Sequence, residues 1–192
     1  MILVIDTSAS TAIVATIVDN GRMSEMSRPS RHPELIGDLR RIARLNRITK
    51  VAVATGPGSF TGLRKGVSFG LGLAMGLRIP IVPLPTLELE AARSDQPVTA
   101  VSDAGRGRFY YLVPGREVAL GEPAEIPTTN PLVGRLDPRA EALLRKAGHR
   151  FKPENELRPF VAAAAELLKT AREVPYGSLK LEYMQSFAPR AK

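Results

Sequence analysis

Three strand patterns precede the first helical pattern, and this order constrains the fold more than any other feature of the chain. Ile2–Ile5 is continuously apolar, as in a buried central strand, and Thr11–Val18 is rich in β-branched residues. Asn20-Gly21 follows, a dipeptide whose residues both accept the positive φ angles of a tight hairpin. Arg22–Ser27 then predicts a returning strand. We therefore expect residues 2–28 to form a three-stranded antiparallel meander.

Helices and strands alternate after the meander. The apolar spacing predicts helices at Pro33–Asn46, Thr61–Leu77 and Thr86–Arg93. Short apolar strands are expected between them, at Val51–Thr55 and Ile79–Val82. The resulting order βββαβαβα predicts a mixed sheet, and it resembles the ribonuclease-H-like fold on which the actin-like (ASKHA) superfamily is built.

A second, shorter series of predicted strands and helices follows. Strands are expected at Val98–Asp103 and Arg108–Val113, with a third at Arg116–Leu120. Helical spacing returns at Pro138–Ala147 and Pro159–Arg172. This part of the chain is expected to be a truncated copy of the first half.

A strand that ends in aspartate and leads into a turn occurs in both halves, at Ile5-Asp6-Thr7 and Ser102-Asp103-Ala104. Residues 121–137, with three prolines and two glycines, predict a loop. We therefore expect a duplicated α/β fold, divided into an N-terminal ribonuclease-H-like unit at residues 1–95 and a smaller, degenerate C-terminal unit at residues 96–192.

The two strand-Asp-turn segments are candidate nucleotide-binding loops. In actin-like ATPases two such loops face each other and hold the phosphates through backbone N–H groups and Mg²⁺ through a carboxylate. Here Asp6, Thr7 and Ser8 form the first loop and Asp103 begins the second, but Ser8 stands where a glycine is expected. The loops are therefore expected to be vestigial. The alternative is that both aspartates are strand-end residues that bond to turn amides.

Composition excludes several kinds of chemistry. The chain has no cysteine, which excludes disulfides, thiolate metal sites and cysteine nucleophiles. Its two histidines, His32 and His149, do not form the spaced pair of a zinc hydrolase. With no tryptophan, six phenylalanines and four tyrosines, an aromatic platform for single-stranded nucleic acid is not indicated. We expect neither a catalytic residue nor a metal site.

The sequence also bears on location. The N-terminus lacks the basic region of a signal peptide. The longest apolar helical stretch, Gly66–Leu77, has 12 residues, whereas a membrane span needs about 20. We therefore expect a cytoplasmic protein without a membrane partner.

The helix predicted at Thr61–Leu77, with Thr61 as its N-cap, repeats glycine at intervals of four residues, at Gly62, Gly66 and Gly70. Gly72 and Gly76 follow in the same helix. Each glycine costs about 1 kcal/mol relative to alanine inside a helix, so the repeat requires a compensating use. Glycine at this spacing makes a flat groove that another backbone can approach closely. A subunit interface and packing on the chain's own sheet explain this groove equally well.

The net charge of +8 is concentrated near the first predicted helix. Residues 22–50 carry eight Lys and Arg against three Asp and Glu, which gives +5 of that total. Arg64 and Lys65 lie in the first turn of the glycine helix, where the helix dipole disfavours cations. These charges reflect either solvated polar helix faces or an anionic partner, RNA or an acidic protein surface.

Four stretches resemble the TsaB (YeaZ) family: ILVIDTSAS at the N-terminus, His32-Pro33-Glu34, the block Val51–Glu88, and SDAGRGRFYY. The block, with GPGSFTGLRKGVSFGLGLAMGL and IPIVPLPTLE, is the most specific part. Pro33 replaces the serine of the family's His-Ser-Glu, and Gly105 replaces its usual arginine. Near the C-terminus, Leu181–Ala188 (LEYMQSFA) resembles the family ending loosely.

The resemblance implies the bacterial machinery that makes N6-threonylcarbamoyladenosine at position 37 of tRNA. In that system TsaD is the transferase, TsaB is a noncatalytic subunit that dimerises with TsaD, and TsaE is an ATPase that joins them. The implied TsaB–TsaD contact is a four-helix bundle that uses the helices Pro33–Asn46 and Thr61–Leu77. The interface residues implied are Leu35, Ile36, Leu39, Ile42, Gly62, Arg64, Gly66, Phe69, Gly70 and Leu73.

The resemblance further implies a homodimer when TsaD is absent, tRNA contact only through the complex, and no cofactor other than nucleotide at the complex junction. On this reading, Gly66→Leu should block the heterodimer and leave the monomer folded. The alternative function is an active small ATPase or kinase of the actin-like superfamily, whose Mg²⁺-dependent turnover Asp6→Asn should abolish. Direct RNA binding is a third reading, recognised by a steep salt dependence.

Overall fold

The computed structural model describes residues 1–45 and 47–182. Asn46, where the first helix was expected to end, and residues 183–188 of the C-terminal resemblance lie outside the described residues. Among the helices in the described ranges, none combines the length and the apolar character that a membrane crossing requires.

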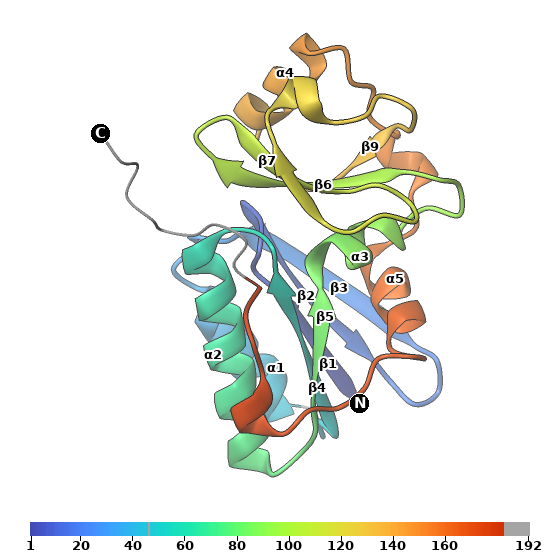
Figure 1. Ribbon diagram of the computed structural model, residues 1–192. Coiled ribbons are helices and arrows are strands. Elements are labelled where there is room, and N and C mark those ends of the chain that lie inside the picture. Colours follow the sequence, from blue (N-terminus) through green and yellow to red (C-terminus); the bar gives the residue numbers. More distant parts are fainter. Residues whose placement is uncertain (46, 183–192) are drawn as a thin grey trace.

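The first sheet has five strands in the order β3-β2-β1-β4-β5 (Figure 1). Its strands are β1 (Ile2–Asp6), β2 (Thr11–Ile17), β3 (Met23–Pro29), β4 (Lys50–Gly56) and β5 (Ile81–Pro85). The first three form the expected antiparallel meander, and β4 and β5 continue it as parallel strands. With its helices the sheet has the predicted order βββαβαβα, and the α/β ribonuclease-H-like fold class is confirmed.

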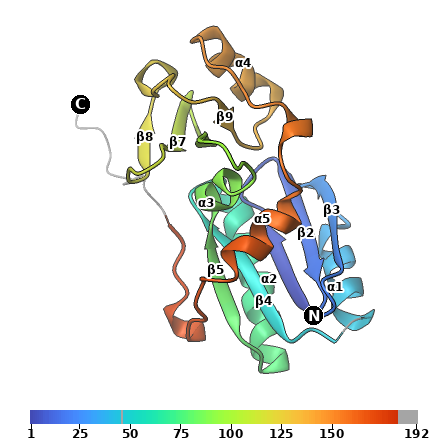
Figure 2. The ribbon, with the colours of Figure 1, turned by 90° about the vertical axis from the view of Figure 1, so that its right-hand side faces the viewer.

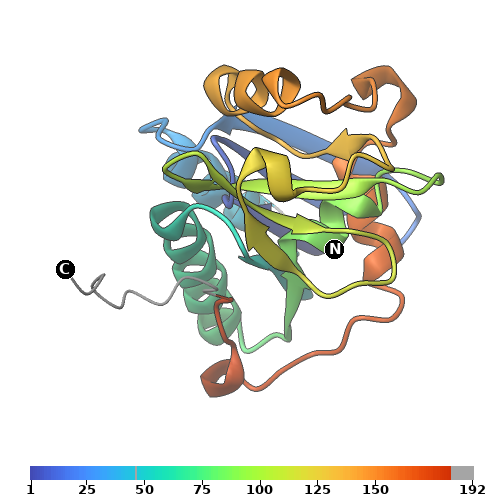
Figure 3. The same ribbon diagram turned by 45° about the horizontal axis from the view of Figure 1, so that its top comes forward.

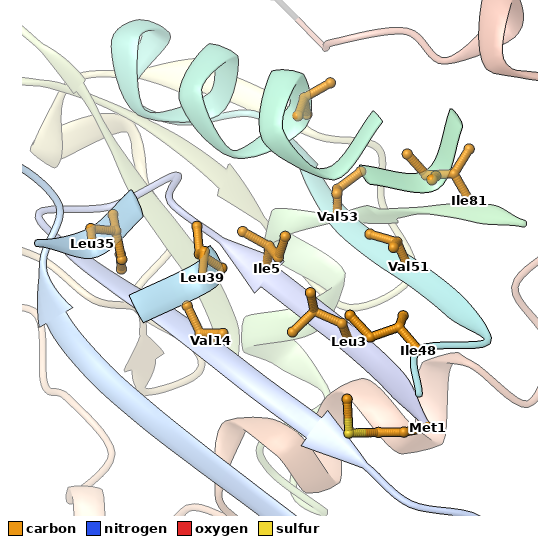
Figure 4. Packing of buried hydrophobic residues seen from close by; sticks show 13 residues of the cluster. Met1, Leu3, Ile5, Val14, Leu35, Leu39, Ile48, Val51, Val53 and Ile81 are labelled. Atoms are coloured by element: carbon orange, nitrogen blue, oxygen red, sulfur yellow. The ribbon is translucent and has the colours of Figure 1, made fainter. Parts of the chain in front are cut away.

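Helices cover both faces of this sheet (Figure 2). Side chains alternate along β1, so Leu3 and Ile5 point to the face covered by α1 (Leu35–Leu45) and α2 (Phe60–Leu77). Figure 4 shows the buried aliphatic side chains that fill this layer. Val4 points to the opposite face, which is covered by α3 (Thr86–Ala91) and α5 (Phe160–Leu167).

The start of α2 differs from the prediction. Ser59, not Thr61, is its N-cap, because the Ser59 hydroxyl accepts a hydrogen bond from the Gly62 N–H at 3.2 Å. The Ser59 N–H in turn donates to the Ser8 carbonyl at 2.7 Å, which ties the cap to the loop after β1. Thr61 lies inside the first turn and is exposed. The contact with Ser8, which lies far away in the sequence, holds Ser59 in the cap position, and the local pattern did not reveal it.

The second sheet has four strands in the order β8-β7-β6-β9. They are β6 (Thr99–Gly105), β7 (Arg108–Leu112), β8 (Ala119–Gly121) and β9 (Leu132–Val133). The helix α4 (Pro138–Lys146) packs on its outer face (Figure 3), and α3 lies between the two sheets. The expected loop at 121–137 contains β9, which is too short for a periodic pattern and is held by parallel pairing with β6.

The C-terminal part of the chain returns to the first sheet. The helix α5 was expected to belong to the second, truncated copy, but Phe160 and Val161 lie in the core of the first sheet. Residues 174–182, which we name the strap, then cover the edge of β5, where Val174 bridges Ile81. The Tyr176 hydroxyl donates to the carbonyl of Ala74, near the end of α2, at 3.1 Å and to the carbonyl of Ile79, beyond the helix, at 2.8 Å.

Candidate functional site

The glycine stripe of α2 faces the chain's own sheet. A Cβ on Gly62 would overlap the carbonyl oxygen of Thr7, one on Gly66 the Thr7 hydroxyl, and one on Gly70 a methyl group of Val53. The Thr7 hydroxyl also donates to the Gly62 carbonyl at 2.7 Å. Of the two uses that the spacing left open, the structure places these three glycines in the packing of α2 on its own sheet, which leaves no room there for a second chain.

The other predicted interface residues divide by exposure. Leu35 and Leu39 are buried in the first sheet's core, and Ile36 and Ile42 lie partly buried at its margin. On α2, Phe69 and Leu73 are also partly buried, whereas Arg64 is exposed. The Arg64 guanidinium stacks on the ring of Phe60, 3.8 Å from its centre. The accessible part of the predicted set is therefore Ile36, Ile42, Arg64, Phe69 and Leu73.

The opposite side of α2 is exposed and apolar. Phe60, Met75 and Leu77 are 39%, 53% and 47% exposed, and the described residues contain two further exposed large apolar side chains, Met23 and Leu143. Gly72 and Gly76 lie on this side with open space at their Cβ positions. We name Phe60, Gly72, Met75 and Gly76, together with Leu77 at the exposed C-terminal end of the helix, the α2 outer face.

The sequence analysis noted Gly72 and Gly76 in this helix but did not include them among the predicted interface residues, although a signal for their position was present. Gly72 follows Gly70 by two residues, which rotates it by about 200° around the helix axis. The repeat of four therefore restarts on the other side of α2, at Gly72 and Gly76. One helix thus carries an inner glycine stripe and an outer one.

The arginines of α1 have two different environments. Asp38 is buried and accepts hydrogen bonds from Arg28 at 3.0 Å and from Arg41. These bonds, above all the one from Arg28, hold the pKa of the Asp38 carboxyl below its usual value. Arg40 and Arg44 are exposed on the far side of α1, and neither has a carboxylate partner within the described residues. They leave positive charge on the exposed side of α1.

A cleft of about 870 Å³ separates the two sheets and brings the two strand-Asp-turn loops together. Ser8 lines it from the first loop, and Asp103 and Gly105 line it from the second. Both aspartates bond to turn amides, as the alternative reading predicted: an Asp6 oxygen accepts the Ser8 N–H, and an Asp103 oxygen accepts the Gly105 N–H, each at 2.7 Å.

The floor of the cleft holds a buried ionic network that the sequence did not indicate. Asp6 at the end of β1 is 0% exposed and pairs with Arg135, which follows β9. Arg135 also pairs with Glu90 of α3, and Glu90 pairs with Arg93 at 3.4 Å. These residues are up to 129 positions apart, so no local pattern connects them. In the described part of the chain, no group of three or more His, Asp or Glu side chains is placed to hold a metal ion.

Known proteins resemble the chain in sequence over limited stretches. A family model described as TsaD, tRNA N6-adenosine threonylcarbamoyltransferase, matches residues 40–132. The protein named tRNA threonylcarbamoyladenosine biosynthesis protein TsaB is 42% identical over 66 residues in Bacillus subtilis and 36% identical over 81 residues in Haemophilus influenzae. These stretches cover 33% and 38% of this chain but only 29% and 33% of the two relatives.

The fold is shared over nearly the whole chain. Two solved structures from Pseudomonas aeruginosa match with TM-scores of 0.72 and 0.70: a protein described as similar to peptidase YeaZ, and YeaZ. The matches cover 96% and 94% of this chain and 99% of each structure. Because sequence identity is only 20% and 19%, this likeness establishes the fold alone.

Proposed function

The chain is a homologue of the TsaB (YeaZ) proteins, and from this premise we propose that it is a noncatalytic scaffold and activator in tRNA N6-threonylcarbamoyladenosine synthesis. Its partner is TsaD, with which it dimerises, and the pair recruits TsaE. Modification of adenosine 37 takes place on TsaD, and tRNA reaches this chain only within the complex.

The observation that carries the proposal is the α2 outer face. Met75 and Leu77 are 53% and 47% exposed, and Phe60, whose ring carries the stacked Arg64 guanidinium, is 39% exposed. Gly72 and Gly76 leave the backbone between them open, so a helix of another subunit can approach closely there. The helices α1 and α2 share one side of the sheet, which supports a bundle of these two helices with two from the partner.

Charge indicates what the partner surface should contain. α2 has no acidic residue, and Arg40 and Arg44 of α1 are exposed without a carboxylate partner in the described chain. A partner surface with acidic residues around an apolar centre complements this arrangement. The excess of arginine near α1 is therefore assigned to protein contact rather than to an independent RNA-binding face.

The interior of the cleft supports a noncatalytic role. The Thr7 hydroxyl is bonded to α2, and both Asp6 oxygens are engaged within the chain. The same docking surface accounts for a homodimer when TsaD is absent, because an exposed apolar face is also available to a second copy. Nucleotide, if required, binds at the junction of the complex.

The test is a titration of this chain with the TsaD of the same organism. Met75→Glu places a carboxylate in the α2 outer face and should weaken binding by about thirtyfold or more, as expected for a central interface residue. Leu143→Glu is the matched control, because Leu143 is an exposed leucine of α4 at 41% exposure and lies outside the docking surface. Wild-type affinity of Met75→Glu would reject the proposed surface.

The activating role is tested separately. Purified TsaD, TsaE and tRNA should form little N6-threonylcarbamoyladenosine until this chain is added. Met75→Glu should restore less activity than Leu143→Glu at equal concentration. Equal product with and without this chain would contradict the proposal.

A further inference from the structure

Two buried carboxylates lie beneath the cleft, and both pair with Arg135, which lines it. Asp6 comes from the end of β1 and Glu90 from α3, and each is at most 1% exposed. Carboxylates that are removed from water require a nearby cation or a set of hydrogen bonds. Carboxylate oxygens are also the ligands that Mg²⁺ prefers, and the sequence predicted Asp6 as part of a nucleotide-binding loop.

Arg135 supplies that cation from the second sheet's side. Its Nη2 donates to Asp6, its Nε to Glu90, and its Nη1 to the Thr11 carbonyl at 3.1 Å. The guanidinium carbon lies 5.0 Å from the centre of the Phe160 ring. Burial alone would lower the pKa of Arg135, but the carboxylates of Asp6 and Glu90 raise it, so the side chain stays charged.

The residues at the cleft floor do not fit a magnesium–nucleotide. One Asp6 oxygen accepts the Ser8 N–H and the other accepts from Arg135. The Glu90 oxygens accept from Arg135 and Arg93, one each. A divalent cation would have to displace a guanidinium that is bonded to two carboxylates and a carbonyl, and it would meet that positive charge at close range.

The same network reaches α2. Asp6 is followed by Thr7, whose hydroxyl bonds to the Gly62 carbonyl and whose own carbonyl oxygen fills the space beside Gly62. Gly134, next to Arg135, is packed against the backbone of Val101 in β6, so the loop that carries Arg135 is fixed on the second sheet. The Arg135 side chain therefore connects the second sheet to the N-terminal end of α2.

We propose that Arg135 is the resident cation of this cleft: it occupies the place of a metal ion on Asp6 and Glu90, and it positions the loop at residues 6–8 and the start of α2 without any ligand. Arg135 is thus a positioning residue. This inference goes beyond the scaffold function and does not depend on TsaD, because it concerns the isolated chain.

The experiment is hydrogen exchange on the isolated full-length chain, with and without excess MgCl₂ or Mg·ATP. In the wild type, neither addition should change exchange at residues 6–10 and 60–63. In Arg135→Met, exchange in these two segments should rise about tenfold or more, because two buried carboxylates lose their cation. MgCl₂ should reverse much of this rise, whereas NaCl of equal ionic strength should not.

Two further variants complete the test. Arg116→Met removes an exposed arginine of the same part of the chain and should leave exchange unchanged. The triple variant Asp6→Asn, Glu90→Gln, Arg135→Met removes the cation and both carboxylates together, so it should fold and should not respond to MgCl₂.

The outcomes that overturn the proposal are distinct. Protection of the wild type by MgCl₂ or Mg·ATP would mean that the cleft still takes a metal. Unchanged exchange in Arg135→Met would reject the positioning role. A rise in exchange that MgCl₂ does not reverse would reject the metal-like role. If Arg135→Met does not fold, the triple variant decides: a folded triple variant supports the proposal, and an equally unfolded one rejects it.

Discussion

The two sides of α2 use the same sequence signal for opposite purposes. On the inner side, Gly62, Gly66 and Gly70 let the helix lie directly on β1, β4 and the loop after β1. On the outer side, Gly72 and Gly76 face open space beside exposed Met75 and Leu77. A glycine repeat therefore indicates that something approaches the helix closely, and only the environment of each glycine shows whether that neighbour is the chain itself or another subunit.

The largest effect is expected from filling the inner side. In Gly66→Leu the new side chain would overlap the Thr7 hydroxyl and meet Ile5, so we expect a loss of roughly 3 kcal/mol or more in the free energy of unfolding. Urea denaturation measures it. The sequence-based expectation was that this variant affects only the heterodimer, whereas the contact with Thr7 predicts a cost to the monomer as well. A urea midpoint equal to that of the wild type would mean that the inner face is not packed as described.

Filling the outer side should give the opposite sign for stability. Gly72→Leu adds a helix-favouring residue in open space and should raise the free energy of unfolding by about 0.5–1 kcal/mol. The same change should weaken TsaD binding, because it blocks the close approach of a partner helix. Calorimetric titration measures the affinity of this variant for TsaD, and urea denaturation measures its free energy of unfolding. Tighter binding by Gly72→Leu would rule out the outer face as the docking surface.

A pH titration tests how the neighbouring helix α1 is held. The pKa of Asp38 is lowered in the folded state, chiefly by its hydrogen bond with Arg28. Its contribution to stability is therefore complete above its unfolded pKa of about 4 and is lost as the pH falls through the lower folded pKa. Asp38→Asn should be less stable than wild type at neutral pH, and the difference should shrink in acid. A constant difference across this range would contradict the assignment.

The smallest effect is expected at the strap. Glu182 lies beside the β4–α2 turn, and burial, followed by the charge of Glu88, raises the pKa of its carboxyl. A raised pKa means that the ionised form opposes folding above that pKa and that this penalty disappears as the pH falls through it. Glu182→Gln should slightly raise the melting temperature at neutral pH but not in acid. Glu117→Gln, at an exposed glutamate outside the strap, is the control and should not change it.

Much of the fold follows from patterns that are local in sequence. The alternation in β1, the β-branched run in β2 and the Asn-Gly turn specify the meander, because strand pairing across a short turn depends on few residues. The boundaries of α1 and α2 were predicted within two residues. The strand β9 and the docking of α5 on the first sheet were not predicted, because both depend on neighbours far away in the chain.

The candidate site was predictable only in part. The sequence identified Asp6 and Asp103 as a related pair and α1 and α2 as the helices of interest, since strand ends and amphipathic spacing are local features. It did not distinguish Gly66 from Gly72 as inner and outer, and it gave no sign of Arg135.

The sequence by itself determined that α2 would be approached closely, that no cysteine chemistry and no spaced histidine pair was available, and that the chain resembles the TsaB (YeaZ) family. Only the tertiary structure decided which side of α2 is free and that Asp6 is neutralised by Arg135. The reason is physical: a helix pattern records which residues share a side, whereas burial and ion pairing depend on which distant segment covers that side.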